Sequence, residues 1–234
     1  MVTSTQSIRS LSNVEFVRSS PYFAGLDDDV LQSIGRLMVE RTVGKNEIIW
    51  LEQAPANAVY FVVSGQIKLF KMSTDGREQI VRLARPGDSF GHTGIFNGGS
   101  NPESAQAMIP SVLWGLAKSD LEVLLWDHKR LALNTIRAMA IEMHHYMSLV
   151  EDLSLRRVRG RLTRLLLKHS SEGVFDESLV LSQGDIAAMT GTVREVCGKS
   201  LKVLEENGII KSSRHQIIIK DIDTLKMMAG AAQV

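Results

Sequence analysis

The 234-residue sequence contains one cysteine, Cys197, and no stretch of about 18 uninterrupted apolar residues. One thiol cannot form an internal disulfide framework, nor can it supply the thiolates of an iron–sulfur cluster. The first residues, MVTSTQSIRSLSNVEF, lack the apolar segment of a secretory signal peptide. These absences predict a cytoplasmic protein without a membrane span, disulfides or an iron–sulfur cluster.

Histidine is also sparse, with six residues and no HxH or HxxxH spacing. Metal-dependent enzymes built on β-barrels need clustered ligands of that kind, so we expect no metal site and no enzymatic activity. A haem would need an axial ligand, for which His92, His144 and His145 are the candidates. Adjacent histidines on a helix are nevertheless more typical of surface positions.

Charge is distributed unevenly along the chain, although its net value is only +1. Residues 1–154 carry 14 Lys and Arg against 17 Asp and Glu, whereas residues 155–234 carry 13 against 9. An excess of positive charge in the last third indicates that this part meets a polyanion such as double-stranded DNA.

Hydrophobic patterning divides the chain into parts. Residues 27–40 repeat apolar positions at helical spacing behind three aspartates. Short β-rich runs punctuated by turn residues follow, with a hairpin turn at residues 74–76. We therefore predict a β-roll of the jelly-roll type within an α+β fold. The runs are EIIWLEQ, AVYFVVSG, QIKLFKMSTDG, EQIVRLARPGDSFG, SAQAMI and SVLWGLA.

Helical periodicity returns from Leu121 to about Leu153, which predicts one long helix. Its apolar stripe is longer than one small β-domain could cover, so we expect a two-fold seam with a second copy rather than packing within one domain. The domains are predicted as 1–128 (sensor β-roll), 129–154 (dimerisation helix) and 155–234 (DNA-binding domain), with a hinge near residues 153–156. The stripe comprises Leu133, Ile136, Ala140, Met143, Met147 and Val150.

The segment LSQGDIAAMTGTVREVCGKSLKVLEENGII predicts a helix-turn-helix. Ser182 and Asp185 have the spacing of a capping box, which places a helix start after Ser182. Residues 190–192, TGT, form the tight turn, and a second helix is expected over residues 193–207, with Val196, Leu201, Val203 and Leu204 facing inward. Residues 209–220 then resemble a two-stranded wing with a basic turn.

Arg194, Glu195 and Lys199 fall on the outer side of the second helix, near its start. Base-reading residues belong there when a recognition helix enters the major groove. Arg donates two hydrogen bonds to guanine and Glu accepts one from cytosine, whereas a merely solvated face is the alternative. Cys197 on this helix is either a thiol switch or, as we favour, a small inward-facing residue.

A glycine-rich stretch, GHTGIFNGGSNPESAQAM over residues 91–108, lies between two apolar runs. Such stretches often cradle a phosphate, and a cradle normally carries Lys or Arg. The only charged residue here is an acid, Glu103. The stretch therefore has the glycines of an anion site without its cation.

From about Phe23 to Gly230 the chain resembles the CRP/FNR family of bacterial transcription regulators. The resemblance rests on VYFVVSGQIKLF, on RPGDSFGHTGIF, on the long helix and on the helix-turn-helix segment. It implies a homodimer paired through the central helices, a sensor β-roll, a winged helix-turn-helix that binds DNA, and contact with RNA polymerase. In the cyclic-AMP branch an Arg-Glu pair and a later Arg read the bases; here these resemble Arg194, Glu195 and Lys199.

The resemblance also implies phosphate contacts by Ser182 and Gln183 and half-sites like TGTGA. Thr192 is a further candidate DNA-binding residue. Because Lys cannot make the planar two-pronged contact of Arg, Lys199 should discriminate less strongly or contact a phosphate.

The cyclic-nucleotide signature is altered in this chain. The family holds the ribose with a Glu after a glycine and the cyclic phosphate with Arg-Ser, whereas His92 follows Gly91 here and Glu103-Ser104 replaces Arg-Ser. A carboxylate in place of a guanidinium repels phosphate, so cyclic AMP is not expected. The candidate effector pocket comprises Gly91, His92, Thr93, Glu103, Ser104, Met143, Tyr146 and Met147.

Met143, Tyr146 and Met147 indicate an apolar pocket for a small hydrophobic or aromatic effector, for haem or for none, although the methionines also suit the dimer core. Two alternatives remain open. The regulator could be independent of any effector and controlled by its abundance, or the β-roll could bind a small molecule beside a protein-interaction winged helix.

Overall fold

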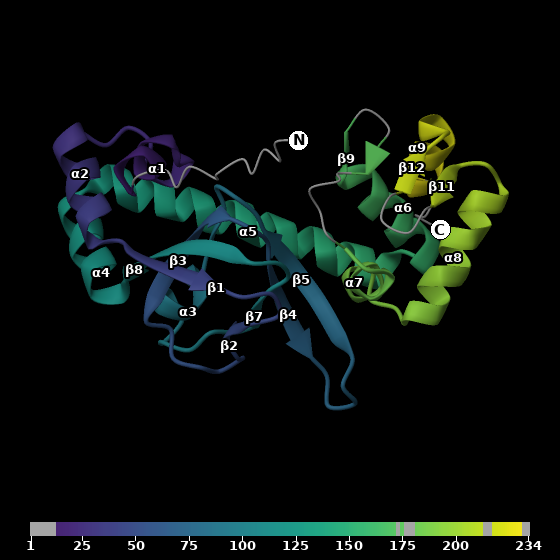
Figure 1. The fold of residues 1–234 in the computed structure, drawn as a ribbon, viewed down its shortest axis with the longest axis horizontal. Helices are drawn as coiled ribbons and strands as arrows, with labels where there is room; N and C mark the ends of the chain where they lie inside the picture. The colour runs from purple at the N-terminus through teal and green to yellow at the C-terminus, as the bar shows by residue number, and fades with distance from the viewer. Residues whose placement is uncertain (1–12, 172–173, 176–180, 213–216, 231–234) are drawn as a thin grey trace, which may run out of the picture.

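The computed structural model describes residues 13–171, 174–175, 181–212 and 217–230. Short N-terminal helices lead into a β-roll, a long helix runs behind it, and a smaller helical domain with its own sheet follows (Figure 1). This arrangement confirms the predicted α+β class and the predicted order of the parts.

The β-roll consists of two antiparallel four-stranded sheets, ordered β1-β8-β3-β6 and β2-β7-β4-β5. All six runs predicted as strands contain one, and the 74–76 turn closes the β4–β5 hairpin with Gly76 at a φ of 82°. The strands are β1 (Val39–Val43), β2 (Ile48–Trp50), β3 (Ala58–Ser64), β4 (Ile67–Met72), β5 (Glu78–Ala84), β6 (Ser89–Phe90), β7 (Ser104–Ala107) and β8 (Ser111–Ala117).

Helices precede and interrupt these strands. The helix predicted over residues 27–40 is shorter: α2 ends at Leu37, because the chain must extend for β1 to pair with β8. The helices of this half are α1 (Asn13–Ser19), the 3-10 turn η1 (Pro21–Phe23), α2 (Asp28–Leu37) and α3 (His92–Phe96).

Two apolar cores hold the sensor half together. One fills the space between the sheets, where Val62, Leu69 and Phe90 are buried. The other joins the N-terminal helices to β3 and β8, with Phe16 edge-on to Trp114 at 4.9 Å. Burial of β3 from both sides explains why AVYFVVS is nearly continuous in apolar residues instead of alternating.

The single helix predicted over residues 121–153 is wrong in one respect: the structure has two helices, α4 (Lys118–Asp127) and α5 (Lys129–Leu155). They meet at His128, whose φ of −124° and ψ of 92° are extended. The break lets Leu124 and Leu131 pack into one core while the helices run in different directions (Figure 1).

The C-terminal domain begins after Arg156, which ends α5 in an extended conformation at the predicted hinge. Its sheet has four strands, ordered β11-β12-β10-β9, where we predicted a two-stranded wing. The basic turn of that wing lies partly outside the described residues. The elements are α6 (Val158–Lys168), β9 (Ser170–Ser171), β10 (Val174–Phe175), α7 (Gln183–Met189), α8 (Arg194–Glu206), β11 (Ile210–Ser212), β12 (Ile217–Ile219) and α9 (Ile222–Gly230).

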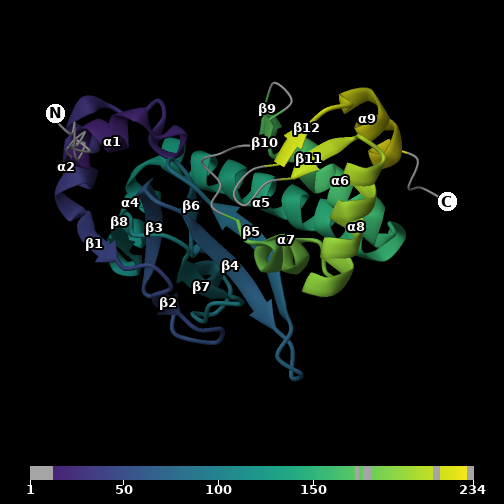
Figure 2. The same ribbon diagram turned by 45° about the vertical axis from the view of Figure 1, so that its right-hand side comes forward.

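The two halves touch where α7 lies beside β5, as Figures 1 and 2 both show. Phe70 and Ile80 of the sensor sheet form one buried cluster with Ala188 of α7. The Gln79 side-chain amide donates to the Met189 carbonyl at 3.4 Å. The first helix of the predicted helix-turn-helix is thus docked directly on the sensor.

We predict that Gly94→Ala destabilises the β-roll by about 1–3 kcal/mol through overpacking. A Cβ at Gly94 would lie 2.6 Å from the Ala56 Cβ and 2.7 Å from the Asn101 Oδ1. Urea denaturation measures the loss. Gly44→Ala is the control, because a Cβ there meets only the Glu47 Oε2 at 3.7 Å. Equal stability of the two variants would contradict the packing argument.

Candidate DNA interface and effector pocket

The glycine-rich stretch folds as a turn followed by the one-turn helix α3. Gly91 begins it with a φ of 93°, a conformation that favours glycine. Its Cβ position lies only 3.0 Å from the Ala58 carbonyl oxygen, so a side chain would strain the turn. The turn directs His92 into the protein interior, where its side chain is 2% exposed. Thr93, the next residue, is half-buried.

His92 is an uncharged ring packed against another ring. It stacks on Tyr22 with ring centroids 5.5 Å apart. Its two nitrogens make no hydrogen bond within the described residues. Burial lowers the pKa of His92 to about 4, so the imidazole is neutral at physiological pH.

A buried ion pair lies beside this histidine. Arg82 of β5 donates to the Glu142 carboxylate of α5 at 2.8 Å and to the Ser89 carbonyl at 2.7 Å. Tyr146 donates its hydroxyl to the same Glu142 oxygen at 3.1 Å, and the His92 Nδ1 lies 3.9 Å from the other oxygen. The sequence did not single out Arg82 or Glu142, and no local spacing marks them, because they meet only through folding.

Glu103 and Ser104, which stand where the family has Arg-Ser, are both buried. Burial and the neighbouring Glu142 charge raise the pKa of Glu103 to about 7. The Ser104 hydroxyl accepts a hydrogen bond from the Glu52 backbone N–H at 2.9 Å. The candidate phosphate position therefore contains the Glu103 carboxyl group and the Ser104 hydroxyl, which already has a hydrogen-bond partner within the protein. Glu103 is not an ordinary surface acid.

The remaining predicted pocket residues separate into two groups. Tyr146 joins His92 and Glu142, whereas Met143 and Met147 are 57% and 66% exposed. These methionines lie with Leu133, Ile136 and Val150 on a bare apolar face of α5. Arg82, His92 and Tyr146 surround Glu142, and all three are polar. Since Tyr146 belongs to this polar cluster and both methionines are exposed, the three residues do not form an apolar pocket together.

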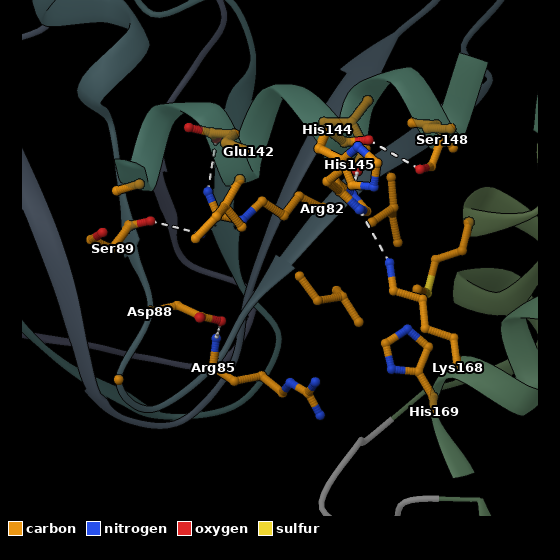
Figure 3. A pocket seen from close by; sticks show the side chains of 18 of the residues that line it. Arg82, Arg85, Asp88, Ser89, Glu142, His144, His145, Ser148, Lys168 and His169 are labelled. Carbon is orange, nitrogen blue, oxygen red and sulfur yellow. Dashed lines mark hydrogen bonds and ion pairs between the residues drawn. The ribbon is translucent and has the colours of Figure 1, made fainter. Parts of the chain in front are cut away.

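A cavity of about 900 Å³ opens between β5, α5 and α6. Figure 3 shows Arg82 and Glu142 on one side of it and Lys168 on another, with His145 near the Lys168 ammonium. His145 Nε2 lies 2.8 Å from the Val81 carbonyl, and its Nδ1 lies 3.1 Å from the Lys168 Nζ. His92 and His144, the other candidate haem ligands, also line this cavity.

The helix-turn-helix forms as its sequence predicts. The Ser182 hydroxyl accepts from the Asp185 N–H, and the Asp185 carboxylate accepts from the Ser182 N–H, which completes the capping box. Gly191 turns the chain with a φ of 62°, and a Cβ there would lie 2.5 Å from the Leu153 Cδ2. Arg161 of α6 fixes this turn by donating to the carbonyls of Thr190 and Gly191.

The second helix, α8, presents charged side chains at its start. Arg194, Glu195 and Lys199 are exposed, and Lys199 pairs with Glu195 at 3.0 Å. Gln183 and Ser182 are also exposed, whereas Thr192 is half-buried beside the β4–β5 hairpin. The five exposed residues thus lie near the starts of α7 and α8, whereas Thr192 lies at the sensor contact.

The inward face of α8 differs slightly from prediction. Leu201 and Leu204 are buried as expected, Val203 is half-buried, and Val196 is 39% exposed. Cys197 is buried, and burial raises the pKa of its thiol to about 11. The thiol is therefore protonated and enclosed, which favours packing over redox switching.

Comparison with known families matches both halves of the chain. Residues 40–128 match the cyclic nucleotide-binding domain, and residues 160–228 match the Crp-like helix-turn-helix domain. The chain belongs to the CRP/FNR family. It is a DNA-binding transcription regulator of that family.

Individual CRP/FNR relatives extend over nearly the whole chain. A CRP-like cAMP-activated global transcriptional regulator of Mycobacterium tuberculosis is 22% identical over 221 residues, covering 92% of this chain and 99% of the relative. The cyclic AMP receptor protein of Thermus thermophilus is 24% identical and covers 91% of this chain and 98% of its own length. The structure of FixK2 from Bradyrhizobium japonicum superposes with a TM-score of 0.74 and 28% identity, over 82% of this chain and 96% of that one.

The described residues contain no helix that is both long and apolar enough to cross a bilayer. They contain no group of three or more His, Cys, Asp or Glu arranged to hold a metal ion.

We predict that Glu103→Gln stabilises this CRP/FNR protein at alkaline pH and has little effect at acid pH. The pKa of Glu103 is higher when folded, about 7, than its ordinary value of 4.5, so the stability linked to its proton is lost as pH rises between these values. Because Gln does not ionise, the variant keeps this stability as pH rises. Its gain in unfolding free energy should grow by about 1–3 kcal/mol from pH 4.5 to pH 8.

Urea denaturation across this pH range measures the difference. Glu40→Gln changes an exposed glutamate of β1 and serves as the control. A pH profile of Glu103→Gln parallel to that of the parent protein would show that folding does not shift the pKa of Glu103.

Proposed function

We propose that this protein is a homodimer that binds a palindrome with TGTGA-like half-sites through α8 and is controlled by an effector other than cyclic AMP. The exposed Arg194, Glu195 and Lys199 on the first turns of α8 carry this proposal. They stand where a recognition helix reads base edges in the major groove. Contact with RNA polymerase, implied by the family, belongs to the same proposal.

The chemistry of these side chains supports a G·C-containing half-site. Arg194 has its guanidinium available for guanine, and Glu195 accepts from a cytosine amino group. Lys199 pairs with Glu195 in the free protein, so it must release this contact or share it when DNA binds. Ser182 and Gln183 are exposed at the start of α7, where a DNA phosphate passes in such complexes.

The bare apolar face of α5 supports the homodimer. Ile136, Met143 and Met147 are exposed at helical spacing, and Leu133 and Val150 extend the face at both ends. A face of this kind on a 27-residue helix is stabilised when a second copy covers it. The two recognition helices then read the two half-sites of a palindrome.

The buried charges of the sensor support an effector other than cyclic AMP. A cyclic phosphate at the glycine-rich stretch would meet Glu103, with Glu142 close behind it. Regulation also requires differential binding to two states, about 5.5 kcal/mol to move a 1:99 population to 99:1. Effector-independent control and the protein-interaction module remain the alternatives, and apoprotein affinity for DNA separates the first from the proposal.

We predict that replacing both Arg194 and Glu195 with Ala abolishes specific DNA binding. Each good base contact contributes about 1–3 kcal/mol of discrimination, so the double change should weaken the preferred palindrome at least about tenfold while random DNA binding changes less. Fluorescence anisotropy measures both affinities. The control is Lys202→Ala, which removes an exposed α8 charge one turn beyond Gly198. Undiminished specific binding by the double variant would show that residues other than Arg194 and Glu195 read the palindrome.

We predict that Met147→Glu dissociates the dimer, because two carboxylates would be buried in an apolar seam. Sedimentation equilibrium measures the subunit mass. Lys129→Glu, at the exposed start of α5, is the matched control and should leave the dimer intact. A Met147→Glu protein that remains dimeric at micromolar concentration would place the interface elsewhere.

A further inference from the structure

An apolar strip lies on α8 beside the charged side chains that read DNA in the proposed function. Val193 and Val196 are 48% and 39% exposed, and they flank Arg194 and Glu195 in the chain. Val196 thus lies at the surface instead of facing inward as predicted. Positions three apart share one side of a helix, so the two valines lie on the same side of α8.

Ser200, four residues after Val196, continues this side of the helix. Its hydroxyl donates to the Val196 carbonyl at 2.8 Å, so its proton is already held by the helix. We call Val193, Val196 and Ser200 the valine strip. A valine side chain has no hydrogen-bonding group, so the two valines can recognise a ligand only through apolar contact.

Valine is a poor residue for the position that Val193 occupies in the helix. Val193 is the N-cap of α8, with a φ of −89° and a ψ of 154°, and its side chain makes no cap hydrogen bond. Ser, Thr, Asp and Asn are preferred there because their side-chain oxygen accepts from the first N–H groups of the helix, as Ser182 does in α7. The stability of α8 therefore does not account for Val193, which points to a contact outside the protein.

The major groove of DNA offers exposed valines one specific partner. Thymine is the only one of the four bases with a methyl group there, and apolar side chains contact it. The valine strip adjoins Arg194 and Glu195, which have hydrogen-bonding partners on guanine and cytosine. Side chains at the start of one recognition helix reach successive base pairs, so the valines and Glu195 reach different pairs of the same half-site.

We propose that the valine strip contacts the C5 methyl group of a thymine in each half-site, at a base pair adjacent to the one that Glu195 reads. Val193 and Val196 are then specificity-determining residues of the recognition helix. They distinguish thymine from uracil, which lacks only this methyl group. The inference rests on the proposed function, because it requires α8 to lie in the major groove.

The experiment removes the methyl group from the DNA without changing the hydrogen-bonding groups of the base. A palindrome selected from random DNA is prepared with each thymine replaced in turn by uracil, and fluorescence anisotropy measures its affinity for the full-length protein. At one thymine the change should weaken binding about fourfold per half-site, equivalent to about 0.8 kcal/mol for one methyl contact. Uracil outside the palindrome is the control and should have no effect.

Protein variants show whether the valines cause this difference. Val193→Ser and Val196→Ala should each reduce the preference for thymine over uracil, and the double variant should abolish it. Val123→Ala, at an exposed position of α4, is the matched control and should keep the full preference. A double variant that prefers thymine as strongly as the parent protein would assign the effect to DNA shape and overturn the proposal.

Val193→Ser also separates recognition from stability. Because Ser caps a helix better than Val, this variant should unfold at the same urea concentration as the parent protein or a higher one, although it discriminates thymine from uracil less. An unchanged preference for thymine, or a loss of stability together with the preference, would overturn the role of Val193.

Failure of this inference differs from failure of the proposed function. If no palindrome is bound in preference to random DNA, the proposed function fails and the inference falls with it. If a palindrome is bound and every uracil substitution is without effect, or if the selected half-site contains no thymine, the inference fails alone.

Discussion

The ion pair between Arg82 and Glu142 connects the sensor sheet to the helix that leads to the DNA-binding domain. Both side chains are largely buried, at 16% and 9% exposure, so the pair persists only because its geometry is good and its remaining hydrogen-bonding groups are satisfied. Ser89 and Tyr146 supply those further contacts. Removing one partner would leave an uncompensated charge in the protein interior, which typically costs about 3–5 kcal/mol. The position of α5 against β5 therefore depends on this pair.

The same pair changes what the glycine-rich stretch can bind. Glu142 brings a negative charge close to Glu103 and raises its pKa, and His92 is held neutral by burial. Arg82 and Lys71 offset part of this negative charge, and the backbone turn made by Gly91 is intact. The structure thus has the turn of the glycine-rich stretch with a buried carboxyl group, Glu103, beside it.

Local sequence signals were sufficient for much of the fold and for the recognition helix. The capping box of Ser182 and Asp185, the turn at Gly191 and the exposed charges of α8 depend on neighbours within one or two turns, so their spacing could be read directly. The break at His128 had no glycine or proline to mark it, and the added strands β9 and β10 are two residues each. The Arg82–Glu142 pair joins residues 60 positions apart, which no periodicity encodes.

Charge is distributed unevenly at the interface between the sensor half and the DNA-binding domain. The buried polar cluster around Glu142 neutralises the centre of the cavity, whereas Lys168 and its neighbours leave a positive end against the DNA-binding domain. α7 already touches β5 through Ala188 and Ile80, and Arg161 holds the turn that orients α8. The position of the helix-turn-helix therefore depends on both β5 and α6, because α7 packs against β5 and the turn after it is hydrogen-bonded to α6.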